Sequence, residues 1–225
     1  MQNSPDKKFK TPAWMGKHCS EEDLMKISLT VRRSESKTSG EIVPMIVRGS
    51  SPRTFIPALV FLFLVILILL GGEPIYESLW ISPTFLNQLP LYLGAAFFSW
   101  FVGNSDFLLR SLTPGSELKK FVQRRAQFEF YEASVQRTAA STGVLIFVSL
   151  AERQVVVLGD KNIAQYLSED VWKSLVQDLV DEIKKGHFAE GMCKSILHAG
   201  KILEKFFPRK PVDFNELPNH LIVKD

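Results

Sequence analysis

The chain contains 225 residues, of which 46% are hydrophobic and 23% are charged, and 27 Lys and Arg against 24 Asp and Glu give a net charge of +3. These proportions are typical of a folded protein and exclude a disordered chain, a collagen and a coiled-coil rod. The small basic excess also argues against a nucleic-acid-binding protein, in which basic residues are more numerous and clustered.

The chain begins with a polar region that predicts a tail, a helix and a strand. Residues 1–19 are basic and are expected to form a frayed tail. A helix is expected from Ser20, a favourable N-cap, to about Glu35, because apolar residues recur there at three- and four-residue spacing. Residues 41–47 predict a strand. Pro44 cannot donate a backbone hydrogen bond, which places this strand at a sheet edge or a bulge.

The next region, residues 54–109, contains no Lys or Arg. Residues 54–72 carry no charge and predict a transmembrane helix, because about 20 apolar residues cross the hydrocarbon core. Residues 91–109 predict the return helix, with an interfacial or re-entrant segment as the alternative. Cations flank this hairpin on both sides, whereas the loop holds Glu73 and Glu77. The positive-inside rule therefore predicts a multi-pass protein of the plasma (inner) membrane with both termini in the cytoplasm.

The region after the hairpin predicts a helix, two strands and two more helices. Residues 144–150 and 154–158 are rich in β-branched and apolar residues, and the gap between them is too short for a crossover helix. They are therefore expected to form an antiparallel hairpin. Helices are expected at residues 168–186 and 189–207, where apolar residues again follow helical spacing.

The first strand has too few neighbours to be stable alone. We therefore expect residues 20–50 and 111–208 to form one α/β domain, a small sheet covered by helices, with the transmembrane hairpin of residues 54–109 inserted in it. Residues 209–225 are expected to be a C-terminal tail. The strand at 41–47 should pair with the strand hairpin at 144–158.

The sequence contains no complete phosphate-binding loop, nucleophile elbow, metal-ligand histidine spacing or dinucleotide fingerprint. The remaining candidates are acids and one arginine that flank the predicted strands: Glu41, Glu152, Arg153 and Asp160. Strand ends are where an open α/β sheet binds ligands, and carboxylate oxygens suit Mg²⁺ or Ca²⁺. The alternative is that these residues are solvated turn residues, and no other cofactor is indicated.

Arg124, Arg125 and Arg137 form a second candidate group. They are candidates for contacts with phosphate or lipid headgroups near the membrane. The alternative interpretation is a solvated helix face.

Several segments resemble the TPM domain family, and most closely its branch of predicted bacterial membrane proteins. They are SEEDL at 20–24, TSGEI at 38–42, TGVLIFVSLAER at 142–153, residues 155–160, Trp172, Gly191, and Phe207 with Pro208.

The resemblance implies a compact α/β fold with a mixed or mostly antiparallel sheet. The family includes a thylakoid acid phosphatase, a photosystem II repair protein and a receptor-modulating membrane protein, and some members are linked to divalent cations. The resemblance thus brings forward Glu41, Glu152, Arg153 and Asp160 as candidate site residues. Unlike those relatives, this chain has the hairpin inside the domain and is expected to place the domain in the cytoplasm.

The expected function is that of a membrane-anchored cytoplasmic domain that binds, assembles or maintains other membrane proteins without catalysis. The alternative is a divalent-metal-dependent phosphomonoester hydrolase, an activity that the resemblance implies although no catalytic motif is recognisable. A lipid-surface module is a third possibility. The expected partners are the membrane and other membrane proteins, and not nucleic acid; the oligomeric state is left open.

Overall fold

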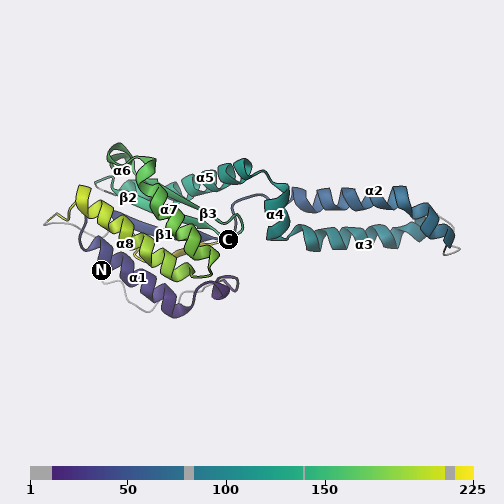
Figure 1. Ribbon diagram of the computed structural model, residues 1–225, viewed down its shortest axis with the longest axis horizontal. Coiled ribbons are helices and arrows are strands. Elements are labelled where there is room, and N and C mark those ends of the chain that lie inside the picture. The colour runs from purple at the N-terminus through teal and green to yellow at the C-terminus, as the bar shows by residue number, and fades with distance from the viewer. Residues whose placement is uncertain (1–11, 79–83, 139, 211–215) are drawn as a thin grey trace. The chain divides into compact units, whose positions relative to one another are not determined.

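The computed structural model describes residues 12–78, 84–138, 140–210 and 216–225. The chain divides into two compact units. The sheet unit comprises Met1–Ser50 and Val122–Asp225, and the hairpin unit comprises Ser51–Phe121. The hairpin unit therefore interrupts the sheet unit in sequence, between its first strand and the rest of its sheet (Figure 1).

The sheet unit is built on a four-stranded mixed sheet with the order β3-β2-β1-β4. The strands are β1 (Glu41–Val47), β2 (Gly143–Ser149), β3 (Gln154–Gly159) and β4 (Ile222–Lys224). β2 and β3 are antiparallel, and β1 pairs with β2 in parallel over its whole length. This confirms the predicted hairpin of β2 and β3, the pairing of β1 with it, and the mixed α/β class.

The predicted edge position of Pro44 is wrong, because β1 lies between β2 and β4. The N–H of Glu41 points toward β2 and donates to the carbonyl of Thr142. Backbone N–H groups alternate in direction along a strand, so the nitrogens of the even-numbered residues of β1 point toward β4. Pro44 is one of these, but β4 pairs with β1 only from Met45 onward. The missing N–H of Pro44 therefore lies where the ladder with β4 has not yet begun.

The prediction that both ends of the chain are tails is also wrong for the residues that the structure describes there. Residues 222–224 form β4, which pairs in parallel with residues 45–47 of β1. Near the start, Met15 lies in a short 3₁₀ helix (Met15–Lys17), and Met15 and Cys19 are buried in the main core. Residues 1–11 and 211–215 of the predicted tails lie outside the described residues.

Helices cover both faces of the sheet, so β1 and β2 are buried on both sides. One face packs against α1 (Glu21–Glu35), α7 (Glu169–Lys184) and α8 (Phe188–Phe206), with the short α6 (Lys161–Tyr166) after β3 (Figure 1). The other face packs against α5 (Gly115–Glu132), through residues such as Val122 and Ala126, and against a 3₁₀ turn (Val135–Arg137). A capping box between Ser20 and Asp23 starts α1, as the predicted N-cap requires.

The hairpin unit consists of α2 (Phe55–Ser78), α3 (Phe85–Gly103) and α4 (Asp106–Leu112), followed by the start of α5. The predicted return helix at 91–109 has the wrong ends, because α3 begins before Pro90 and stops at Gly103. Gly103 lets α3 approach α2 closely, because a Cβ on it would lie 2.7 Å from the Cα of Pro57. The predicted loop between the spans includes residues 79–83, which lie outside the described residues.

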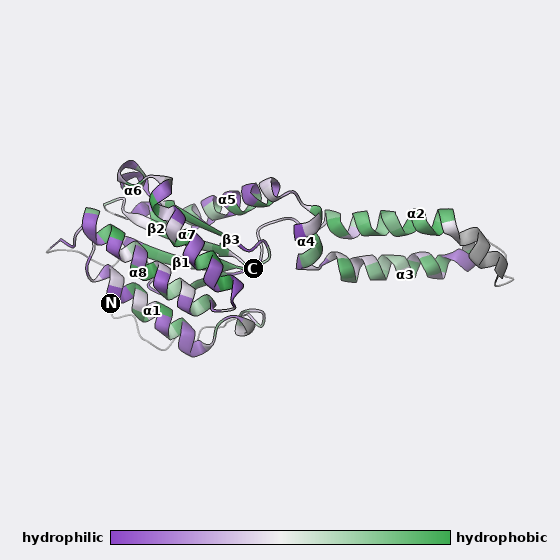
Figure 2. Cartoon of the chain, in the orientation of Figure 1, coloured by the Kyte–Doolittle hydropathy of each residue, from purple (hydrophilic) through white to green (hydrophobic). Residues whose placement is uncertain are grey.

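Large apolar side chains of α2 and α3 face outward, and most of both helices is hydrophobic (Figure 2). Within the part of the chain that the structure describes, no helix has both the length and the apolar composition needed to cross a membrane. The two transmembrane spans therefore stay a prediction.

Candidate functional site

The sheet divides the four predicted site residues between its two ends. Glu41 opens β1 and Asp160 directly follows β3, and both backbones bond to the start of β2: Asp160 N–H donates to Gly143 O at 2.9 Å. Glu152 and Arg153 lie in the turn after β2. A seven-residue strand is about 20 Å long. One cation therefore cannot bind the carboxylates of both groups.

Glu152 is buried, and its carboxylate binds the backbone that follows β1. It is only 3% exposed, and its two oxygens accept the backbone N–H of Ser50 at 3.1 and 3.2 Å. The hydroxyl of Ser149 donates to Oε2 at 2.5 Å and lies 2.8 Å from the hydroxyl of Ser50. Ser50 is the last residue of the sheet unit before the hairpin unit. The geometry thus gives Glu152 a structural role at this junction.

Arg153 is a turn residue with an exposed side chain. Its φ of 55° lies in the left-handed region, and its N–H donates to the carbonyl of Leu150 at 3.1 Å. Such a position usually takes Gly or Asn, because a Cβ is unfavourable there. The neighbouring charges of Glu152 and Arg153 thus have different surroundings, one buried and one in solvent.

Asp160 caps the short helix α6. Its Oδ1 accepts the N–H of Lys161 at 2.6 Å, and the residue is 7% exposed. Its Oδ2 is buried and accepts no hydrogen bond from the described residues. Asp160 therefore combines a capping role with one carboxylate oxygen that is not used by the fold.

Glu41, which is buried, pairs with a half-buried residue that the sequence interpretation missed, Glu35 at the end of α1. Oε1 of Glu41 accepts the N–H of Glu216 at 3.2 Å. The oxygens of Glu35 accept the N–H of Ile42 at 2.9 Å and a hydrogen bond from the side-chain amide of Asn219. The sequence did contain a sign of this pair: only five residues separate Glu35 from Glu41, so both acids flank the short connection between α1 and β1.

Burial is the main cause of the unusual titration of this pair. Burial raises the pKa of Glu35 to about 8, and the nearby charge of Glu41 also raises it, whereas the hydrogen bond from the N–H of Ile42 lowers it. Burial likewise raises the pKa of Glu41, opposed by N–H donors of Glu216 and Leu217. Two adjacent carboxyls in a low dielectric hold one proton more firmly than either would alone.

The three candidate arginines also have separate surroundings. Arg125 points inward and pairs with Glu129 at 2.9 Å, and it donates to the backbone carbonyl of Asp225 at 3.2 Å. Glu129 is 1% exposed and also pairs with Lys224 of β4 at 2.5 Å. Arg124 and Arg137 are exposed. Arg125 therefore ties α5 to β4, and only the other two present their charge to solvent.

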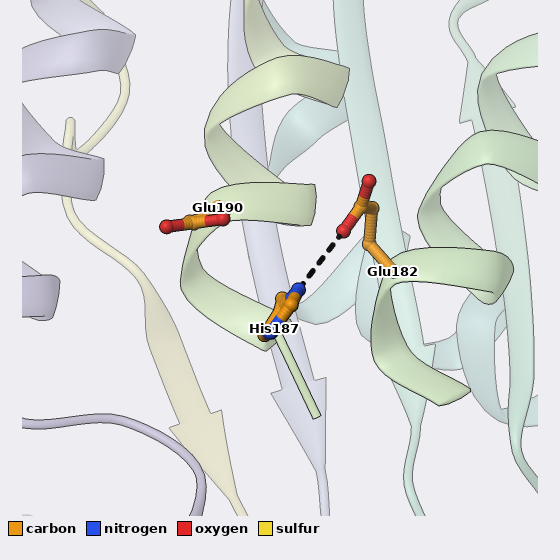
Figure 3. A group of neighbouring side chains, drawn as sticks. All are labelled: Glu182, His187 and Glu190. Atoms are coloured by element: carbon orange, nitrogen blue, oxygen red, sulfur yellow. Dashed lines mark ion pairs between the residues drawn. The ribbon is translucent and has the colours of Figure 1, made fainter. Parts of the chain in front are cut away.

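Among the described residues, one group has the composition of a metal site: Glu182, His187 and Glu190 (Figure 3). Nδ1 of His187 lies 3.4 Å from Oε2 of Glu182. The other oxygen of Glu182 already has two cations near it, Lys194 at 2.9 Å and Lys185 at 3.9 Å. The hydrogen bond from Lys194 is the main cause of the lowered pKa of Glu182. We interpret this group as a surface charge network that joins α7 to α8.

The family model of the TPM domain matches residues 109–202. This range runs from α4 into α8 and does not include α1 and β1, which the topology places in the same sheet unit. A search of curated proteins finds no significant match.

Among solved structures, the chain is similar to the NMR structure of the BA42 protein from the psychrophilic bacterium Bizionia argentinensis, with a TM-score of 0.58 and 23% sequence identity. The alignment covers 92% of this chain and 95% of that one. At this identity the likeness concerns the fold. Residues 109–202, less than half of the chain, are thus similar to the TPM domain.

Proposed function

We propose that the protein is anchored by its hairpin unit in the plasma (inner) membrane, with both termini in the cytoplasm. The outward apolar surface of the hairpin unit carries this proposal. Its exposed large apolar residues include Leu59, Leu62, Phe63, Ile66, Leu67, Leu70, Leu91, Leu93, Phe97, Phe98, Trp100 and Phe101. A water-soluble protein rarely exposes so large a contiguous apolar surface, whereas a lipid bilayer covers it favourably.

The charges at the base of the hairpin support the same arrangement. Arg53 pairs with Asp106 at 2.7 Å and donates to the carbonyl of Asn104 at 3.1 Å. Residues 54–109 contain no Lys or Arg, whereas cations flank them on both sides. This distribution favours a cytoplasmic base and an external tip, because cationic flanks stay in the cytoplasm.

The outer face of α5 is suited to the lipid surface. Arg124, Phe128 and Tyr131 follow one another at four- and three-residue spacing, and all three are exposed. Cations with neighbouring aromatic residues favour the headgroup region of an anionic bilayer. We therefore assign headgroup contacts to Arg124 and Arg137, and not to Arg125.

The role that we propose for the sheet unit is binding or maintenance of other membrane proteins without catalysis. The carboxylates needed by a hydrolase lie at opposite ends of the sheet, and Glu152 is used to hold Ser50. By contrast, Met25 and Leu29 are 67% and 59% exposed, one turn apart on the otherwise polar outer face of α1. Exposed apolar pairs at this spacing are typical of helix contacts with a protein partner.

Cysteine labelling in intact cells tests the membrane arrangement. Both native cysteines are buried and would be replaced by Ala, so that they cannot affect the result. Ser82→Cys should react with a membrane-impermeant maleimide from outside, whereas Ser174→Cys, exposed on α7, should react only after permeabilisation. Labelling of Ser174→Cys in sealed cells would contradict the orientation.

Two measurements on the full chain test the proposed role. A photo-crosslinker at Leu29 should capture membrane proteins, whereas one at Ser174 serves as the matched exposed control. The purified protein should not hydrolyse p-nitrophenyl phosphate with either Mg²⁺ or Ca²⁺. Turnover that follows the protein through purification and is lost in Asp160→Asn would instead favour the hydrolase.

A further inference from the structure

Two carboxyl groups, one buried (Glu41) and one half-buried (Glu35), bind the same short segment near the end of the chain. Glu41 accepts the N–H of Glu216, and Asn219 donates its side-chain amide to Glu35. Ser28 of α1 donates its hydroxyl to the carbonyl of Asn219 at 2.9 Å. Residues 216–219 thus contact α1 and the start of β1 through both acids, and the side chain of Leu217 packs in the core beside β1.

A separate set of contacts holds the far end of the segment. Lys224 pairs with Glu129 of α5, and Arg125 donates to the backbone of Asp225. The indole of Trp14 donates to the Asp225 carboxylate at 2.7 Å. The near end and the far end are therefore anchored independently, one by an acid pair and the other by cation–carboxylate contacts.

The acid pair needs a proton to remain in contact. Both oxygens of Glu35 accept hydrogen bonds, from Ile42 and Asn219, whereas Oε2 of Glu41 is buried and accepts none from the described residues. Oε2 of Glu41 is thus the oxygen left to share a proton with Glu35. Glu216, on the segment itself, is a charged group that faces the pair, and its carboxylate repels Glu41.

We propose that residues 216–221 form a latch that is closed by one proton shared between Glu35 and Glu41 and that opens when this proton is lost. Without the proton, two adjacent carboxylates repel each other and face the charge of Glu216. The near end then separates from α1 and β1, while the contacts of Lys224 and Asp225 retain the far end.

The direction of the pH dependence follows from the raised pKa values. Glu35 has an ordinary pKa of 4.5, and burial raises it to about 8 in the folded protein. An acid whose pKa is raised by folding stabilises the fold fully below its ordinary value and loses this contribution as the pH rises toward the folded value. The latch should therefore be closed at about pH 6 and open at about pH 9.

Glu41→Gln provides a matched control that cannot lose the proton. Its amide can donate to Glu35 and its oxygen can accept from Glu216, so the variant imitates protonated Glu41 at every pH. Amide hydrogen exchange would be measured by NMR on the full chain in detergent micelles. Comparison of the two proteins at the same pH cancels the intrinsic pH dependence of exchange.

At about pH 6 the Glu216 and Leu217 amides should exchange at similar rates in both proteins. At about pH 9 they should exchange about tenfold faster or more in the wild type, which corresponds to one pKa unit of coupling. The Lys224 amide should differ little. Equal exchange of Glu216 and Leu217 in the two proteins at pH 9 would overturn the proposal.

A second measurement needs no variant and remains decisive if Glu41→Gln does not fold. The chemical shifts of the Glu216 and Leu217 amides in the wild type should titrate with a midpoint near pH 8, whereas that of Lys224 should not. The absence of a transition between about pH 6 and pH 9 would show that the segment does not respond to the pair.

Discussion

At the scale of single residues, the buried carboxylate of Glu152 should stabilise the folded protein, because it accepts a hydrogen bond from the backbone. Glu152→Ala would leave the N–H of Ser50 without its acceptor, and the hydroxyl of Ser149 would keep only the hydroxyl of Ser50 as a partner. Unmet buried donors cost about 1–3 kcal/mol each, so we expect a clear decrease in the free energy of unfolding.

Arg153→Gly is the matched control for this prediction. Gly adopts the left-handed φ of 55° without strain, so this variant should be neutral or more stable by up to about 1 kcal/mol. Denaturant unfolding of the two variants and the wild type provides the comparison. Equal stability of Glu152→Ala and wild type would contradict the role assigned to Glu152.

The candidate site could be predicted only in part, for reasons visible at particular residues. The sequence pattern correctly placed Glu41 and Asp160 at strand ends, since apolar runs define those ends. The predicted antiparallel hairpin already separated Glu152, in its turn, from Asp160 at its open end, but the sequence could not show that Glu41 lies with Asp160, because this depends on β1 being parallel to β2. Glu35 was missed because its contacts with Ile42 and Asn219 form only after α1 and residue 219 meet at β1.

At the scale of elements, a half-buried ion pair between Lys224 and Glu129 joins α5 to β4. Lys224→Ala would remove one of the two cations near the almost fully buried Glu129, leaving only Arg125. Loss of a partner from a buried carboxylate is expensive, but Lys224 is itself 37% exposed, so we expect about 1–3 kcal/mol of destabilisation.

Lys120→Ala is the control, because Lys120 pairs with Glu117 in solvent on the same helix. An exposed pair contributes about 0–1 kcal/mol. Thermal unfolding should therefore separate the two variants clearly. Similar melting temperatures would mean that the pair of Lys224 and Glu129 contributes no more than a surface contact.

The strands show why the sheet was only partly predictable from sequence. β2 and β3 were recognisable as two apolar runs with a gap too short for a helix. Pro44 was misleading, because the sequence does not show which neighbour each β1 nitrogen faces. β4 has three residues and follows a polar stretch, so it lacks a periodic signal of its own and depends on β1 for its pairing.

At the scale of the whole molecule, the sheet unit is made from two separated parts of the chain. Its β1 strand lies between β2 and β4, so both parts are needed for one sheet. Replacement of residues 51–121 by a flexible Gly-Ser linker should therefore leave a domain that unfolds cooperatively. Residues 122–225 alone should not fold, because β2 would lose its partner β1.

Circular dichroism and calorimetry of the two proteins test this division. A cooperative transition in residues 122–225 alone, equal to that of the linked protein, would show that β1 is not required. Failure of the linked protein to fold would instead show that the hairpin unit is needed for the sheet unit to form.

The position of the hairpin also sets an order of events on the ribosome. β1 is synthesised first, yet its partners β2 and β4 follow only after the whole hairpin. At about 5–20 residues per second, roughly 5 to 20 s separate the synthesis of β1 from that of β2. During this interval a strand that is buried along its whole length in the folded protein has no sheet to enter. The nascent chain must therefore shield β1 by transient contacts or a chaperone.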